Sequence, residues 1–558
     1  MIENKKKTVA IFGAGISGLT VAHEFSKRGY LVKVFESNSE AGGFFRSARR
    51  KKDNNMPSEY SWHGMGPWYH NVYSLLKEIP FDNESSLYDQ ILSRPIDFGL
   101  AGNSGRTEFD DLKGLSVDVK KMFRLTTKDT WLWYWIMFKA WCSNKRSYQH
   151  YSTLNAKKVW GNFLSPLGIN TWSSTFGPWV GSDWCNVSFH QVAKFFKAQL
   201  TSKPSHFHKA DEEGGPWEHK ARSGWLLLKG PSSEMWFDKW VSYLKKLNVE
   251  FNWDEELIKL DFDGVNIQSA TTATNKKVEA DIYVMAINPF FLANIIDRTK
   301  ALAKLPELNL FRGLVQDGPH VQVSFRIGFS EQIKWPRKRC GLVIEDSAFN
   351  LTLFSEEQVW NKSVFLGKNI KSLWTVTACV SKIPGPVHKT PLNNCTKEQF
   401  IDEVMFQLKE CSGLDKLIKE ANNGKSWTEY RIEEVEVWHE WVFSPEGISS
   451  PQPKWVNTTN TQKYMPSQKT TIPNLVLAGA HTKTSVDVWS IEAAVESGKL
   501  AAKVYEPEVE VIGQHNPVFF RVISRIDDLL FSLMLPNVLD LMLVIIFLGS
   551  LILLYHLL

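Results

Sequence analysis

Two short apolar runs near the start of the chain, Thr8–Phe12 and Leu31–Phe35, enclose a segment whose apolar positions repeat with a helical period to about Arg28. This order predicts a strand, a helix and a second strand parallel to the first. Three glycines with the spacing GxGxxG separate the first strand from the helix: Gly13, Gly15 and Gly18.

Each feature of this loop has a role in binding a dinucleotide. The first glycine permits a tight turn, the second lets a pyrophosphate approach the backbone at the helix N-terminus, and the third lets helix and strand pack closely. Glu36 directly follows the second strand and is placed to accept hydrogen bonds from ribose hydroxyls. The combination predicts a dinucleotide-binding βαβ unit rather than an ordinary glycine turn.

The hydrophobic pattern changes at the other end of the chain. Residues 541–558 carry no formally charged side chain, and about 20 apolar residues span a bilayer as a helix. This run predicts a transmembrane anchor, and its position predicts a tail-anchored protein whose folded domain lies in the cytosol.

Residues 515–535, just before the anchor, have the pattern of an amphipathic interfacial segment. One helical face carries Phe519, Phe520, Val522, Ile523, Ile526, Leu529 and Leu530, and the other carries Arg521, Arg525, Asp527 and Asp528. The apolar face is expected to lie on the membrane.

The aromatic run Trp131–Cys142 is too short to span a bilayer. A core helix is the first interpretation. A wall of a substrate tunnel, or a patch on the membrane surface, is the alternative, because aromatic side chains favour the interface.

Composition and charge exclude several classes of function. The 558 residues are enough for two or more core-forming units, and the net charge is only +5. No basic stripe alternates with aromatic residues, so a nucleic-acid partner is not expected. The six cysteines show no CxxC spacing and no accompanying histidine cluster, which favours free thiols over disulfides or a metal site.

Further motifs resemble those of a known family. Gly42 and Gly43, followed by Arg46, resemble the loop that wraps the cofactor in the FAD-dependent amine oxidase and phytoene desaturase superfamily. The segment His63–Ile79, which includes Gly64, is similar to the family's glycine-containing stretch beside the flavin. The segments 250–257, ending in Leu257, and 278–289 are similar to the strands that contact the adenine end.

The stretch Pro473–Tyr505 resembles the closing FAD motif of the family, and its spacing is closest to plant-type carotene desaturases. The resemblance implies cofactor contacts for Gly479, Ala480, Ser490, Ile491 and Glu492. Ala480 stands where those desaturases usually have an aspartate that holds the ribityl chain. Together these segments imply that the glycine loop binds FAD.

The expected fold is α/β: a discontinuous, Rossmann-like FAD-binding domain, a mixed α+β substrate domain and a C-terminal transmembrane helix. We assign 1–100, 215–300 and 465–510 to the FAD-binding domain, and 101–214 and 301–464 to the substrate domain. The second part includes alternating strand patterns such as HVQVSFRIGF and SLWTVTACV.

The resemblance implies an FAD-dependent oxidoreductase that transfers hydride to flavin from an apolar substrate, an isoprenoid or other lipid, at a membrane. A flavin amine oxidase is the alternative, and a non-catalytic prenyl-protein escort is a second one. No catalytic acid or base is evident, and the candidates near the flavin are His63, Trp68 and Trp489. The stretch Val437–Phe443 supplies aromatic residues where amine oxidases of this superfamily have an aromatic cage, but core packing is the first interpretation there. No metal site and no oligomeric state are predicted.

Overall fold

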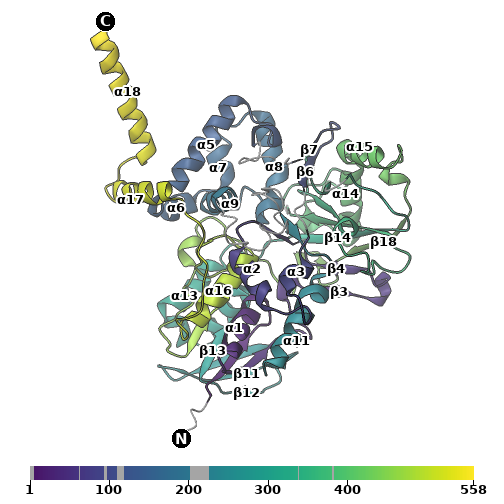
Figure 1. Ribbon diagram of the computed structural model, residues 1–558, viewed down its shortest axis with the longest axis vertical. Coiled ribbons are helices and arrows are strands. Elements are labelled where there is room, and N and C mark those ends of the chain that lie inside the picture. The colour runs from purple at the N-terminus through teal and green to yellow at the C-terminus, as the bar shows by residue number, and fades with distance from the viewer. Residues whose placement is uncertain are drawn as a thin grey trace.

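The computed structural model describes residues 6–61, 63–93, 97–109, 119–201, 225–336, 339–379 and 382–557. Its first sheet has five parallel strands drawn from distant parts of the chain (Figure 1). Their order is β21 (Leu475–Leu477), β13 (Ile282–Met285), β1 (Thr8–Phe12), β2 (Leu31–Phe35) and β9 (Glu250–Asn252). The predicted strand–helix–strand unit is confirmed, with helix α1 spanning Ile16–Lys27.

Both faces of this sheet are buried. Successive side chains of a strand point to opposite faces, and those of β1 enter two different cores. Val9 and Ile11 of β1 pack into one core, with α1 and α16 (Ile491–Lys503). Ala10 and Phe12 pack into a separate core. That core includes a three-stranded antiparallel sheet made of β10 (Leu257–Phe262), β11 (Ile267–Thr272) and β12 (Lys277–Val278). Burial on both faces explains why β1 reads as a continuous apolar run.

A second sheet of seven strands forms another core. Its order is β18 (Ile432–Val437), β14 (Val323–Phe329), β17 (Ser372–Ala378), β16 (Thr352–Ser355), β15 (Arg339–Ile344), β6 (Asp97–Ala101) and β7 (Thr107–Phe109). Only the β6–β15 pair is parallel. Helices α14 (Lys397–Glu410) and α15 (Ser412–Ala421) contribute to its core. The two alternating patterns seen in the sequence are β14 and β17.

A group of helices joins these layers and is rich in tryptophan. It comprises α5 (Thr127–Trp141), α6 (Lys145–Gln149), α7 (Ala156–Trp160), α8 (Pro166–Val180) and α9 (Phe189–Thr201). Trp160 lies 4.6 Å from Trp172 and 6.2 Å from Trp133, measured between ring centroids. The aromatic run Trp131–Cys142 therefore supplies core residues such as Trp133, as first interpreted, but Trp131 is 74% exposed.

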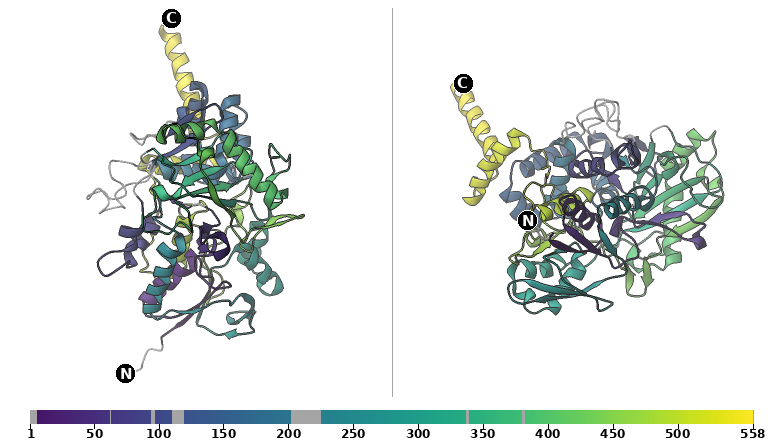
Figure 2. Two further views of the ribbon diagram at one scale, coloured as in Figure 1. Left: turned by 90° about the vertical axis from the view of Figure 1, so that its right-hand side faces the viewer. Right: turned by 60° about the horizontal axis from the view of Figure 1, so that its bottom comes forward.

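Two helices near the C-terminus complete the described chain. α17 (Val518–Ser532) lies against α6, and α18 (Val538–Leu557) projects away from the rest of the molecule (Figures 1 and 2). Among the described residues, one helical stretch, Val538–His556, is long and apolar enough to cross a membrane, and it is almost entirely unburied.

The faces of α17 differ from the division expected along the sequence. Phe520, expected on the membrane face, and Asp527, expected on the polar face, are both buried against the body of the protein. Arg521 and Arg525 are exposed. The difference arises because Arg146 on α6, far away in the sequence, pairs with the buried Asp527 carboxylate and so determines which side of the helix faces inward.

Candidate active site

The glycine loop lies between β1 and α1, at the carboxyl end of the parallel sheet, where α/β folds bind ligands. Gly13 has a φ of +103°, and a side chain there would collide with the carbonyl oxygen of Ala286. A side chain at Gly18 would collide with the carbonyl oxygen of Gly13. Both glycines are therefore required by the packing of the protein itself.

Gly15 is different, because a Cβ built on it meets no protein atom within 4 Å. Gly15 is the N-cap of α1 and lines a cavity of about 550 Å³. The backbone N–H groups at a helix N-terminus attract phosphate. The open space above Gly15 thus fits the pyrophosphate of a dinucleotide.

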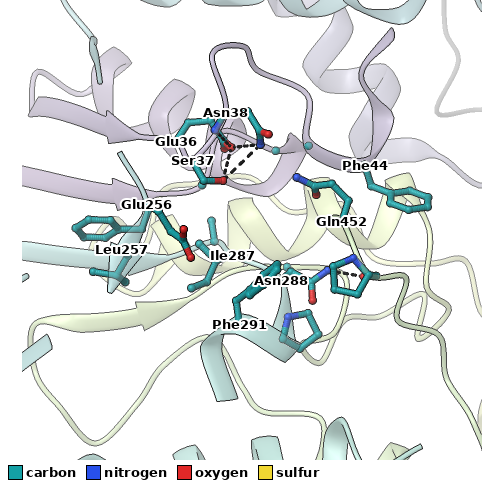
Figure 3. A pocket seen from close by; sticks show the side chains of 18 of the residues that line it. Glu36, Ser37, Asn38, Phe44, Glu256, Leu257, Ile287, Asn288, Phe291 and Gln452 are labelled. Carbon is teal, nitrogen blue, oxygen red and sulfur yellow. Dashed lines mark hydrogen bonds between the residues drawn. The ribbon is translucent and has the colours of Figure 1, made fainter. Parts of the chain in front are cut away.

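Glu36 lines the same cavity and is held by several donors (Figure 3). One carboxylate oxygen accepts from the backbone N–H of Ala14 at 2.6 Å. The other accepts from the backbone and side chain of Asn38, at 3.0 and 2.6 Å, and from the Ser37 hydroxyl at 3.1 Å. These bonds fix the carboxylate at the end of β2, and the oxygen that accepts only from Ala14 keeps a lone pair for a hydroxyl ligand.

The far walls of this larger cavity come from other segments. Glu256, Leu257, Ile287, Asn288 and Phe291 line it together with Gln452 (Figure 3). Gly479 and Trp489 line it as well. We call this space, lined by Gly15, Glu36, Leu257, Gly479 and Trp489 among others, the nucleotide cavity.

A second cavity of about 260 Å³ adjoins the first, because Gly15, Phe44, Ala286, Lys454 and Trp489 line both. Its walls are largely aromatic and aliphatic. They include Trp68, Tyr69, Val180, Phe195, Trp225 and Ile491. We call it the apolar cavity.

The structure brings most of the residues singled out in the sequence to these two spaces. The nucleotide cavity is lined by Gly13, Gly15, Glu36, Gly43, Leu257, Gly479 and Trp489. The apolar cavity is lined by Gly15, Gly42, His63, Gly64, Trp68, Ala480, Trp489, Ser490 and Ile491. Gly18, Arg46 and Glu492 line neither.

Arg46 and Glu492 have structural partners instead. Arg46 is buried, donates to the carbonyl of Gly43 at 3.0 Å and pairs with Glu440. Glu492 accepts from the backbone N–H groups of Asn71 and Val72, at 2.9 and 3.0 Å. These two groups belong to the first turn of α2 (His70–Glu78), so Glu492 caps that helix.

His63 stands at the edge of the apolar cavity. Its Nδ1 lies 3.2 Å from a carboxylate oxygen of Glu59, and the centroids of the His63 and Phe45 rings are 3.7 Å apart. Burial is the main influence and lowers the pKa of His63, although the Glu59 carboxylate opposes this. The imidazole is therefore neutral near pH 7.

Lys454 is a site residue that the sequence pattern does not reveal. It is 1% exposed and lines both cavities. Its Nζ donates to the carbonyl of Gly181 at 2.8 Å and to the side chain of Gln322, and it lies 5.1 Å from the ring centroid of Trp489. Burial lowers the pKa of Lys454 to about 8.

Nothing in the local sequence around Lys454 distinguishes it from a surface lysine. Its partners come from α8's C-terminal turn and from the start of β14, each more than 100 residues away.

The aromatic residues of Val437–Phe443 pack elsewhere. Trp438 and Trp441 belong to the core of the seven-stranded sheet and line neither cavity. Both rings contact Tyr60, which stacks on Phe44 with 4.9 Å between ring centroids. Core packing, the first interpretation of this stretch, accounts for them.

Comparison with known proteins adds two family matches. Residues 231–504 match the family of flavin containing amine oxidoreductases, and residues 11–79 match an NAD(P)-binding Rossmann-like domain. No curated protein sequence matches the chain.

Solved structures with a similar fold include several oxidases. Putrescine oxidase bound to putrescine is 14% identical, with a TM-score of 0.58 over 90% of this chain and 99% of that one. Cyclohexylamine oxidase from Brevibacterium oxydans is 13% identical, with a TM-score of 0.54 over the same shares. An oxidoreductase from Methanosarcina mazei is 12% identical, with a TM-score of 0.57 over 90% and 100%. At these identities the likeness concerns the fold.

Proposed function

Because the chain belongs to the FAD-dependent amine oxidase superfamily, we propose that it oxidises a neutral, apolar small molecule, an isoprenoid or other lipid, held in the apolar cavity. Bound FAD supplies the two-electron acceptor for such a reaction. The nucleotide cavity would hold its nucleotide part through Gly13, Gly15, Glu36 and Leu257.

The observation that carries this proposal is the character of the apolar cavity. None of the described residues that line it is acidic, and the charged side chain among them is Lys454. A cationic amine would leave its charge beside this lysine without a carboxylate partner, which is costly in a buried space. Large apolar walls instead stabilise an apolar ligand and exclude water from the reacting carbon.

Lys454 has the geometry for handling a proton at the junction of the two cavities. With a pKa of about 8, a substantial fraction of its amine is neutral at slightly alkaline pH and able to accept a proton at Nζ. Gln322 and the carbonyl of Gly181 hold that nitrogen in place. We propose Lys454 as the proton acceptor, and Trp489 as the aromatic wall beside it.

Amine oxidation is the second candidate, because two of the structures with this fold are amine oxidases. The non-catalytic escort loses support, since the chain is an FAD-dependent oxidoreductase by family and offers a second cavity beside the nucleotide site.

The experiment that separates the two candidates is anaerobic reduction of the purified flavoprotein. Fractions of a membrane lipid extract and a panel of primary amines and polyamines are each added as the reducing substrate. Bleaching of the flavin is followed by absorbance. Bleaching by an apolar lipid fraction supports the proposal, whereas bleaching by amines alone contradicts it.

We further propose that α18 anchors the protein in a membrane with its folded body on the cytosolic side. The apolar stretch Val538–His556 supports the anchor. The cytosolic side is supported by five cysteines that form no disulfide: Cys142, Cys185, Cys379, Cys395 and Cys411. Protease added outside sealed microsomes should then degrade the body. A glycan on the sequon at Asn186 would contradict the proposed side.

A further inference from the structure

Helix α17 docks on the body of the protein through one of its sides. Phe520 packs against the rings of Phe138 and Trp141 on α5, at centroid distances of 6.0 and 5.8 Å. The ammonium group of Lys197, on α9, lies 5.0 Å from the Phe520 ring centroid. The helix is therefore part of the folded body, in contact with α5 and with α9, whose Phe195 lines the apolar cavity.

Charged groups hold the same side of α17. Asp527 is fully buried and accepts from Nε of Arg146 at 3.1 Å and from the backbone N–H of Val538 at 2.9 Å. Asp528 accepts from the backbone N–H groups of Asn144 and Lys145, at 3.0 and 2.6 Å. We call the bonds of Asp527 and Asp528 to these partners the clasp.

A clasp of this kind gives α17 a fixed rotation about its axis. A buried carboxylate that loses its partner is costly, so rotating the helix would require exposing or unpairing Asp527. Because Val538 begins α18, the same carboxylate also ties the start of α18 to α17.

The opposite side of α17 presents a continuous apolar stripe. Val518, Val522, Ile526, Leu529 and Leu533 follow one another at intervals of three or four residues, and all are exposed. Phe519 and Met534 are exposed beside them. Soluble surfaces seldom carry so many large apolar side chains together, and such patches mark interaction sites.

We propose that this stripe lies in the headgroup–acyl boundary of a lipid bilayer, so that α17 binds the membrane side-on while the clasp holds the body in one orientation on it. The proposal rests on α18 being a membrane span, since the stripe ends a few residues before that helix begins. Arg521 and Arg525 are exposed on the same helix and suit the lipid phosphates.

The clasp also changes how the charge of this segment acts on a membrane. Counted along the sequence, Asp527 and Asp528 cancel the two arginines. In the fold, both carboxylates face the body and are bound there, whereas the arginines remain outside. The membrane-facing side of α17 is consequently apolar and cationic.

The stripe is tested by placing an environment-sensitive fluorophore on Val522→Cys in the full-length holoprotein, reconstituted in phosphatidylcholine vesicles. Val265→Cys is the matched control, because Val265 is an exposed valine in the turn between β10 and β11. The native cysteines should label slowly, since burial raises the pKa of Cys142 and Cys185 to about 11 and four others are buried.

Quenchers carried on lipid chains should reduce emission from position 522 several-fold and leave emission from position 265 unchanged. Aqueous iodide should reduce emission from position 265 and leave emission from position 522 unchanged. Equal iodide quenching at both positions would overturn the proposal, because α18 alone would then hold the membrane. Protection of position 522 from both quenchers would also overturn it, in favour of a protein partner or a second copy.

The clasp is tested with Asp527→Asn in the Val265→Cys background, with FAD retention as the criterion of folding. Energy transfer from a probe at Val265→Cys to acceptor lipids should give a broader range of distances than in the parent protein. An unchanged range would show that the clasp does not orient the body. If Asp527→Asn loses flavin, Asp528→Asn, whose partners are backbone N–H groups on the surface, serves in its place.

Discussion

At the residue scale, Gly15 offers the sharpest test of the cofactor site. We expect Gly15→Val to fold but to lose FAD, because a Cβ at this position meets no protein atom within 4 Å and the side chain would occupy the space above the helix N-terminus. The flavin-to-protein ratio after gel filtration measures this. Gly513→Val is the matched control, since a Cβ there also meets no protein atom, and it should keep its flavin. A Gly15→Val variant with full flavin content would refute the assignment.

Glu36 provides a graded test of the ribose contact. Glu36→Ala should weaken FAD binding by about 1–3 kcal/mol, the range of a lost hydrogen bond to a charged group. The affinity of Glu36→Gln for FAD should lie between those of Glu36→Ala and the parent protein, since its amide oxygen still accepts one set of hydrogen bonds. Dissociation constants from titration of the apoprotein give the answer, and an unchanged constant for Glu36→Ala would remove Glu36 from the site.

Lys454 predicts a pH dependence of flavin reduction. Its pKa is lowered from 10.5 to about 8, so the neutral amine increases as the pH rises through that value. The rate of reduction by substrate should therefore rise between about pH 6 and 9 with an apparent pKa near 8. Lys454→Arg should abolish this rise, because guanidinium stays charged, and Lys454→Met should slow reduction by about 10²–10⁴-fold. A rise that persists in Lys454→Arg would assign the proton to another group.

At the element scale, helices begin and end at residues whose partners lie far away in the sequence. The closing-motif resemblance implies a cofactor contact for Glu492, whereas in the structure its carboxylate caps α2 through Asn71 and Val72. The start of α16 thus joins two helices of the body as well as lying beside the apolar cavity through Ser490 and Ile491.

This assignment separates stability from cofactor affinity. Glu492→Ala should lower the free energy of unfolding by about 1–3 kcal/mol, because two buried N–H groups lose their acceptor. The affinity of the folded variant for FAD should stay that of the parent. Chemical denaturation and FAD titration measure the two quantities. A loss of affinity without a loss of stability would restore the cofactor role implied by the resemblance.

At the scale of the whole molecule, the residues of both cavities come from segments before position 495. A variant that ends at Asp540 should therefore remain yellow. Its turnover of a membrane-partitioned substrate should fall more than its turnover of a detergent-dispersed one, because the anchor raises local concentration without taking part in the chemistry. Equal losses of turnover with both substrates would show that α18 stabilises the folded body itself.

The sequence alone predicted the local features of this protein. The βαβ unit, the strands β14 and β17 and the apolar stretch of α18 follow from periodicity and composition, which neighbouring residues determine. The glycine loop was recognisable for the same reason, since its spacing describes a turn only a few residues long. The domain boundaries assigned from the sequence stay a prediction.

Tertiary structure decided everything that depends on which distant segments meet. Lys454 became a site residue because Gly181 and Gln322 bury its amine between two cavities. Asp527 turned inward on α17 because Arg146, nearly 400 residues earlier, supplies its partner. The periodicity of a helical segment predicts that the helix has two faces. Which charged residue can be buried depends on the free energy of burying it, and therefore on its neighbours in space. Those neighbours exist only once the chain has folded.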